Sequence, residues 1–144
     1  MVKRRKHPPM QTHLYLLEGA GGKMTYTGIT HSLWLRLKKH NSKHGKRFTR
    51  KYQPWSMLAY ISGFRTRSHA ASFEYFTKHQ SLSRSGRYTN LPHRVFLNRL
   101  DHILMCVEKW QVKQGHAYDL VCTLKIELPA NFRTVRKYVT IVTP

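Results

Sequence analysis

The sequence predicts an α+β fold: a small three-stranded antiparallel sheet flanked by helices, followed by a further helix and two strands. Two short strand-like runs on either side of a glycine cluster indicate a hairpin. Apolar residues recur at helical spacing in two later segments. The end of the chain shows β-branched alternation. With 144 residues, 40% of them hydrophobic, the chain is long enough and apolar enough for a packed core.

The first elements are a hairpin and a helix. Strands at 13–18 and 24–29 flank the glycine-rich residues 19–22, which we interpret as a turn because consecutive glycines adopt positive φ easily. A phosphate loop is the alternative, but no Gly-Lys-Ser/Thr and no helix follow. A helix is expected over 32–42, with Ser32 as N-cap and Leu33 and Leu37 on its inner face.

The middle of the chain predicts a basic loop, a strand and a second helix. The loop covers 43–52, and the third strand follows Pro54 over 55–64. A helix over 67–80 carries one apolar stripe, formed by Ala70, Phe73 and Phe76.

The last third predicts a long helix and two strands. A polar stretch at 81–90 is either a linker or a flexible loop facing DNA. The helix is expected over 92–110, and the strands over 118–126 and 134–142. Six apolar residues lie at helical spacing in the long helix: Phe96, Leu97, Leu100, Ile103, Leu104 and Val107.

Charge indicates the kind of partner. The chain has 26 Lys and Arg against 6 Asp and Glu, a formal net charge of +20. Nucleic acid is the favoured polyanion, because each neutralised phosphate releases condensed counterions. An anionic membrane is the competing partner, but no lipid motif, basic amphipathic helix or spanning apolar run stands out. The basic residues 3–6 are either a nuclear localisation patch, a phosphate-gripping arm or a plain tail.

Two pairs of polar residues are placed to share a surface. Tyr15 and Tyr26 lie on the two hairpin strands, and their hydroxyls come side by side if the hairpin packs its leucines inward. Arg36 and His40 are four apart on one helix face. Carboxylates are scarce, since only two lie in the first 80 residues, Glu18 and Glu74.

The order of these residues resembles the GIY-YIG nuclease family. The matching pieces are Tyr15-Leu16-Leu17, Tyr26-Thr27-Gly28-Ile29-Thr30, Leu35 to Asn41, Thr49 to Trp55, Gly63-Phe64 and Phe73-Glu74-Tyr75. They look most like the branch with the catalytic subunit of the eukaryotic endonuclease that resolves branched DNA. The resemblance implies a nuclease core at 12–84, between a basic flexible arm at 1–11 and a C-terminal extension at 85–144. His13 and Thr27 depart from the name-giving pattern at positions that supply no reacting group in the family.

The resemblance implies a hydrolytic site for DNA phosphodiesters. Tyr15 or Tyr26 would take the proton from water while the other orients it, with nearby cations easing tyrosine ionisation. Arg36 would grip a phosphate oxygen and His40 would hydrogen-bond a tyrosine or the phosphate. Glu74 would hold one Mg²⁺ or Mn²⁺. Each residue also has a purely structural alternative; Glu74, for example, is placed to balance Lys78 one turn away.

A basic cluster follows this helix and is expected to contact DNA. Its two aromatic residues, Phe48 and Tyr52, either stack on an unpaired base or anchor the loop to the core. Asn41 is either a DNA contact or a helix C-cap. The expected DNA-binding residues are Lys39, Asn41, Lys43, Lys46, Arg47, Arg50, Lys51 and Tyr52.

The resemblance has limits. The eukaryotic subunit carries a cysteine-rich zinc module that docks a scaffold, whereas this chain has two cysteines, Cys106 and Cys122, which we expect to be buried thiols in a reducing compartment. Scaffold docking is therefore not carried over. We expect branched or flapped DNA as substrate and an intracellular location, nuclear or at a cytoplasmic site of DNA replication. The alternatives are a noncatalytic nucleic-acid binder and a nicking nuclease of the repair or homing type.

Overall fold

The structure is a computed structural model, and it describes residues 11–43, 47–81, 86–115, 118–133 and 139–144. The predictions for the basic arm and for Lys46 lie outside these residues, as does the first half of the strand expected over 134–142.

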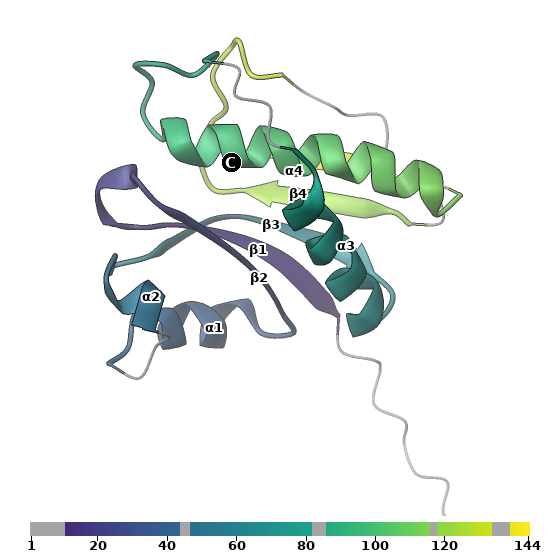
Figure 1. The fold of residues 1–144 in the computed structure, drawn as a ribbon, viewed down its shortest axis with the longest axis horizontal. Helices are drawn as coiled ribbons and strands as arrows, with labels where there is room; N and C mark the ends of the chain where they lie inside the picture. The colour runs from purple at the N-terminus through teal and green to yellow at the C-terminus, as the bar shows by residue number, and fades with distance from the viewer. Residues whose placement is uncertain (1–10, 44–46, 82–85, 116–117, 134–138) are drawn as a thin grey trace, which may run out of the picture.

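Five strands form one sheet in the order β2-β1-β3-β4-β5 (Figure 1). All neighbours pair antiparallel except β4 and β5, which are parallel. The strands are β1 (Thr12–Glu18), β2 (Thr25–Thr30), β3 (Ser56–Phe64), β4 (Leu120–Leu124) and β5 (Val139–Val142). The helices are α1 (Leu33–His40), α2 (Arg47–Arg50), α3 (Arg67–His79) and α4 (Arg94–Lys113), with a 3-10 turn η1 (Ala20–Gly22) in the hairpin.

The α+β class is confirmed, but the sheet is larger than predicted. The first three strands form the expected antiparallel unit, and β4 then pairs with the free edge of β3 at Ala59–Ser62. The expected three-stranded sheet is thus one side of a mixed five-stranded sheet. The backbone N–H and C=O groups at the edge of a sheet need hydrogen-bond partners, and β4 supplies them to β3.

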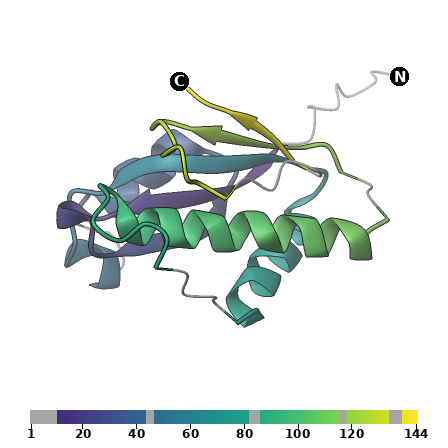
Figure 2. The same cartoon turned by 90° about the horizontal axis from the view of Figure 1, so that it is seen from above.

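The two faces of the sheet have separate apolar cores. Leu14 and Leu16 point to α3 and α4, which cover one face, whereas Tyr15 and Leu17 point to the face covered by α1. Alternation along β1 therefore gives each face of the sheet its own core, and Figure 1 shows helices on both sides of the sheet. Figure 2 shows that α4 lies across the sheet along its whole length. Its six predicted apolar residues are all buried.

Local sequence features explain the hairpin and the helix starts. Gly21 and Gly22 have φ of 81° and 69°, which confirms the predicted turn. Ser32 is the N-cap of α1, but its hydroxyl makes no cap bond; instead Thr30 Oγ1 accepts a hydrogen bond from the Ser32 N–H at 3.1 Å. The stripe on α3 is confirmed, since Ala70 and Phe73 are buried.

The predicted basic loop is partly helical, which corrects the expectation. Residues of α2 form one short turn whose Thr49 is fully buried. The indole N–H of Trp55 donates to the Thr49 carbonyl. A turn of four residues is too short to show apolar periodicity, so its sequence reads as a loop.

Both cysteines are buried free thiols, as predicted. Within the part of the chain that the structure describes, no helix is both long and apolar enough to cross a membrane.

Candidate active site

A pocket of 380 Å³ lies at the exposed edge of the sheet, beside β2 and between α1 and α3. We call it the Glu74 pocket. The residues that line it are Tyr15, Tyr26, Gly28, Ile29, Arg36, Arg67, Ala71, Glu74 and Lys78. Four of the five residues expected to carry chemistry therefore converge, although they come from four different elements.

Gly28 makes room for Tyr15 in this pocket. The two residues are partners across the β1–β2 pair. A Cβ on Gly28 would meet the Tyr15 hydroxyl and would lie 2.6 Å from Tyr15 Cζ, well inside van der Waals contact. Only a residue without a side chain lets the Tyr15 ring cross beneath β2 toward the pocket.

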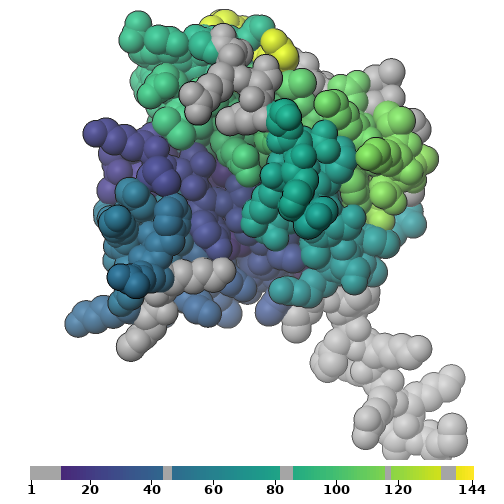
Figure 3. Space-filling view, viewed as in Figure 1, coloured from purple at the N-terminus to yellow at the C-terminus, as the bar shows by residue number. Residues whose placement is uncertain are grey.

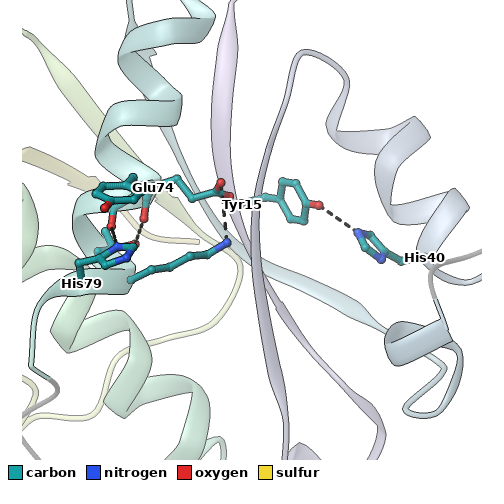
Figure 4. A network of polar contacts seen from close by, with 7 residues as sticks. Tyr15, His40, Glu74 and His79 are labelled. Carbon is teal, nitrogen blue, oxygen red and sulfur yellow. Dashed lines mark hydrogen bonds and ion pairs between the residues drawn. The ribbon is translucent and has the colours of Figure 1, made fainter.

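His40 lies behind the pocket and holds the Tyr15 hydroxyl. Its Nε2 is 2.9 Å from Tyr15 Oη, and both side chains are buried. Figure 4 shows this hydroxyl pointing at His40 from β1 toward the end of α1. The Tyr26 ring packs on the same imidazole with 4.7 Å between centroids, and the two tyrosine rings lie 6.2 Å apart. The predicted pairing of the tyrosines is thus present, with Tyr15 buried rather than on a surface.

Electrostatics keep Tyr15 protonated. Burial raises the pKa of Tyr15 well above its usual range, and the neighbouring Tyr26 raises it further. The Arg36 guanidinium lowers the pKa of Tyr15, but by less than burial raises it. The hydroxyl of Tyr15 therefore keeps its proton, and His40 Nε2 lies within hydrogen-bond distance of it.

Three cations surround the mouth of the pocket. Arg36 comes from α1, while Arg67 and Lys78 come from α3. No carboxylate in the described residues pairs with either arginine, and Lys78 Nζ lies 3.7 Å from Glu74 Oε1. Guanidinium groups without an acidic partner are suited to phosphate oxygens.

Glu74 is the one carboxylate that lines the pocket. Its side chain is 21% exposed, and it reaches from α3 toward the strand that carries Tyr15 (Figure 4). The described residues contain no group of three His, Cys, Asp or Glu that could enclose a metal. One accessible carboxylate fits a hard divalent ion that keeps most of its water and takes other ligands from a substrate phosphate.

Glu18, the other carboxylate of the first 80 residues, lies elsewhere. Both of its oxygens are 2.8 Å from Nδ1 of His93, the residue that precedes α4. His93 has φ of 61°, in the left-handed region. This contact ties the end of β1 to the start of α4, so Glu18 has a structural position.

The basic residues predicted to bind DNA separate into two groups. Lys39, Lys43, Arg47, Arg50 and Lys51 are exposed on and after α1. The Asn41 amide instead bonds the Trp55 backbone through both its oxygen and its nitrogen, at 2.6 and 3.0 Å. Tyr52 packs against the core cluster of Tyr15 and Trp55, with its ring 6.2 Å from that of Trp55. These contacts favour the anchoring interpretation for Tyr52, and Asn41 is the C-cap of α1, the structural alternative given for it.

Sequence reasoning did not assign Arg67 and Lys78 to the site. Both lie on the face of α3 that carries Glu74, seven residues before it and four after it. Residues four or seven positions from Glu74 share its helix face, so this spacing identifies both residues. The two departures noted above, His13 and Thr27, do not line the pocket.

Comparisons with known proteins show what the chain is similar to. Residues 11–88, more than half of the chain, match the GIY-YIG catalytic domain. The chain is 28% identical over 108 residues to the structure-specific endonuclease subunit slx1 of Schizosaccharomyces japonicus. The matched stretch covers 68% of this chain and 40% of that protein.

Two further relatives match shorter stretches. A structure-specific endonuclease subunit SLX1 homolog of Giardia intestinalis is 38% identical over 64 residues, 43% of this chain and 18% of its own length. A UPF0213 protein of Cupriavidus pinatubonensis is 38% identical over 71 residues, 49% of this chain and 77% of its own length. The chain thus spans less than half the length of the two endonuclease subunits.

Proposed function

Because the chain belongs to the GIY-YIG family of nucleases, we propose that it is a metal-dependent endonuclease that hydrolyses DNA at the Glu74 pocket. The observation that carries the proposal is the convergence of Tyr15, Arg36 and Glu74 on one pocket, with His40 bonded to Tyr15. Metal-dependent phosphodiester hydrolysis uses a general base that takes a proton from the attacking water, a cation that binds the phosphate and a ligand that holds the metal ion.

Proton transfer begins at Tyr15 in this proposal. Water attacks the phosphorus and gives a proton to Tyr15 Oη, while the phenolic proton passes to His40 Nε2 across the 2.9 Å hydrogen bond. The phosphorus–oxygen bond to the 3′ oxygen breaks, and that oxygen takes a proton from solvent. The relay avoids a free tyrosinate, which the raised pKa of Tyr15 makes costly. Tyr26, which is less buried and packs on His40, orients the water.

The remaining groups neutralise charge. Arg36 grips a non-bridging phosphate oxygen as negative charge develops, and Arg67 stands across the pocket as a second cation. Glu74 would hold one Mg²⁺ or Mn²⁺, which supplies Lewis-acid stabilisation of the phosphate and the leaving oxygen when bound. The ion pair of Glu74 with Lys78 is weak and partly exposed, with 3.7 Å between Nζ and Oε1, so the Glu74 carboxylate would be available to hold the ion.

The exposed basic residues on and after α1 extend this site into a DNA surface. Lys39, Lys43 and Lys51, with both arginines of α2, contact phosphates there, and Lys46 belongs to the same sequence cluster. Phe48 is 45% exposed among them and is available to stack on an unpaired base.

Branched or flapped DNA is the proposed substrate. Its support is the similarity to two proteins that are named structure-specific endonuclease subunits. The test is cleavage of labelled flap, fork and linear duplex DNA with Mg²⁺ and with EDTA. Faster cutting of the branched substrates, lost in EDTA, supports the proposal. Equal cutting of all three, or cutting at one defined sequence or lesion, indicates instead a nicking nuclease of the repair or homing type.

A further inference from the structure

A second cavity, of 650 Å³, adjoins the Glu74 pocket and leads away from it. It lies between β2 and the N-terminal half of α4, and we call it the α4 groove. Tyr26 and Lys78 line both cavities, so the two adjoin along the edge of the sheet. Figure 3 shows the hairpin in purple, α3 in teal and α4 in green meeting on one face of the molecule.

The far wall of the groove presents two cations within a mostly apolar lining. Arg94, Asn98 and Arg99 of α4 line it, and Thr27 faces them from β2. Neither arginine has an ion pair with a carboxylate in the described part of the chain. Arg99 is also half-buried, and burial lowers the pKa of its guanidinium. A partly desolvated cation without an acidic partner favours an anion from outside the chain.

The fold holds this wall in place. Glu18 bonds His93 directly before Arg94, and the inner face of α4 is buried in the larger core. The groove therefore has a fixed position relative to Tyr26 at its inner end. Residues 94–99 lie beyond the segment that matches the GIY-YIG catalytic domain, so the groove is built jointly by that domain and the segment that follows it.

We propose that the α4 groove is a subsite for the phosphodiester backbone of the strand that leads out of the Glu74 pocket, with Arg94 and Arg99 each contacting one phosphate. This inference rests on the proposed function for the location of the cut. A cavity of this volume lies in the range of about 300–1,000 Å³ that suits small-ligand sites, which fits part of a single strand and is too small for a duplex. The groove thus selects the path of one strand beyond the scissile bond.

The test is equilibrium binding of a fluorescent flap DNA by the whole chain in EDTA, with salt varied from 0.05 to 0.3 M. Arg94→Ala and Arg99→Gln are compared with Lys109→Ala, which removes one exposed charge from α4 outside the groove. Each arginine variant is expected to weaken binding about five- to tenfold at 0.1 M salt. Each should also reduce the salt slope by about 0.7–0.9, the value for one lost phosphate contact. Lys109→Ala is expected to change the slope much less.

The inference is overturned if both arginine variants match Lys109→Ala in affinity and slope. Arg94 is exposed, so its alanine variant gives the answer even if Arg99→Gln fails to fold. Binding in EDTA needs no cleavage. A nuclease mechanism disproved at Glu74 would therefore leave this result standing, and an unused groove would leave the cleavage chemistry untouched.

Discussion

The hydroxyl of Tyr15 lies 2.9 Å from Nε2 of His40, although the two residues are 25 positions apart in the chain. The hydrogen bond is buried and joins β1 to the last residue of α1. It links the residue proposed to accept the proton of the attacking water to a group that can take the phenolic proton. The predicted proximity of His40 to a tyrosine is present, and the partner is Tyr15.

Removing either end of this pair should slow cleavage. We expect Tyr15→Phe and His40→Ala each to lower the single-turnover rate by about 10²- to 10⁴-fold, the usual contribution of general base catalysis. Because the two act in one relay, the double variant should be no slower than the worse single variant. Tyr75→Phe, at an exposed position of α3 outside the pocket, is the control and should cut normally. Independent, multiplying losses would contradict the relay.

Gly28→Ala should displace the Tyr15 ring. The added Cβ would lie 2.6 Å from Tyr15 Cζ, so overpacking should destabilise the fold by about 1–3 kcal/mol and abolish cleavage. The cause is checked by chemical denaturation of the wild type, Gly28→Ala, Tyr15→Ala and the double variant, which gives the unfolding free energy of each. In the Tyr15→Ala background, Gly28→Ala should lower the unfolding free energy only slightly. An equal cost in both backgrounds would mean that Tyr15 is not what the glycine accommodates.

Glu18 should affect stability and leave catalysis intact. Its carboxylate bonds His93 ahead of α4 and does not line the pocket. His93 is 38% exposed, so solvent screens the pair and we expect Glu18→Gln to cost about 0.5–1.5 kcal/mol of unfolding free energy. Cleavage rates of the folded variant should equal those of the wild type. A large loss of rate at full Mg²⁺ would place Glu18 in the metal chemistry after all.

Stability should fall at alkaline pH partly because of Cys122. Burial raises the pKa of its thiol from 9.0 to about 12. Between these values the unfolded chain has lost the proton and the folded chain has kept it, so deprotonation favours unfolding. From pH 9 to 12, unfolding free energy should fall faster in the wild type than in Cys122→Ala, by about 1.4 kcal/mol per pH unit. Parallel curves for the two proteins would show that the thiol titrates normally.

The strand and helix order could be predicted because it depends on local patterns. The leucines of β1 that face α3 and α4 and the apolar stripe on α4 show in the sequence itself, and both are buried as expected. The opposite face of β1 was expected to be a surface, but Tyr15 and Leu17 are buried there under α1. The register that places Tyr15 opposite Gly28 was not predicted, because residues 19–24 form a connection too long to fix one register from its length alone.

The remaining features depend on contacts between distant segments. Nothing local in residues 120–124 shows that they pair with β3, nor that β5 lies parallel to β4. The bond from Glu18 to His93 spans 75 positions, and the α4 groove exists only once that helix is docked. The meeting of Glu74 with Tyr15 is equally nonlocal, and the family resemblance, rather than periodicity, predicted it.

The most direct test of the central claim is single-turnover cleavage of flap DNA in Mg²⁺ by Glu74→Ala. Binding should be measured in parallel, with Glu127→Ala as an exposed carboxylate outside the pocket. We predict that Glu74→Ala binds the flap at least as tightly as the wild type, because an anion is removed, and cuts it at least 10²-fold more slowly. Glu127→Ala should cut normally. Cleavage by Glu74→Ala at the wild-type rate would contradict the assignment of this pocket as the active site.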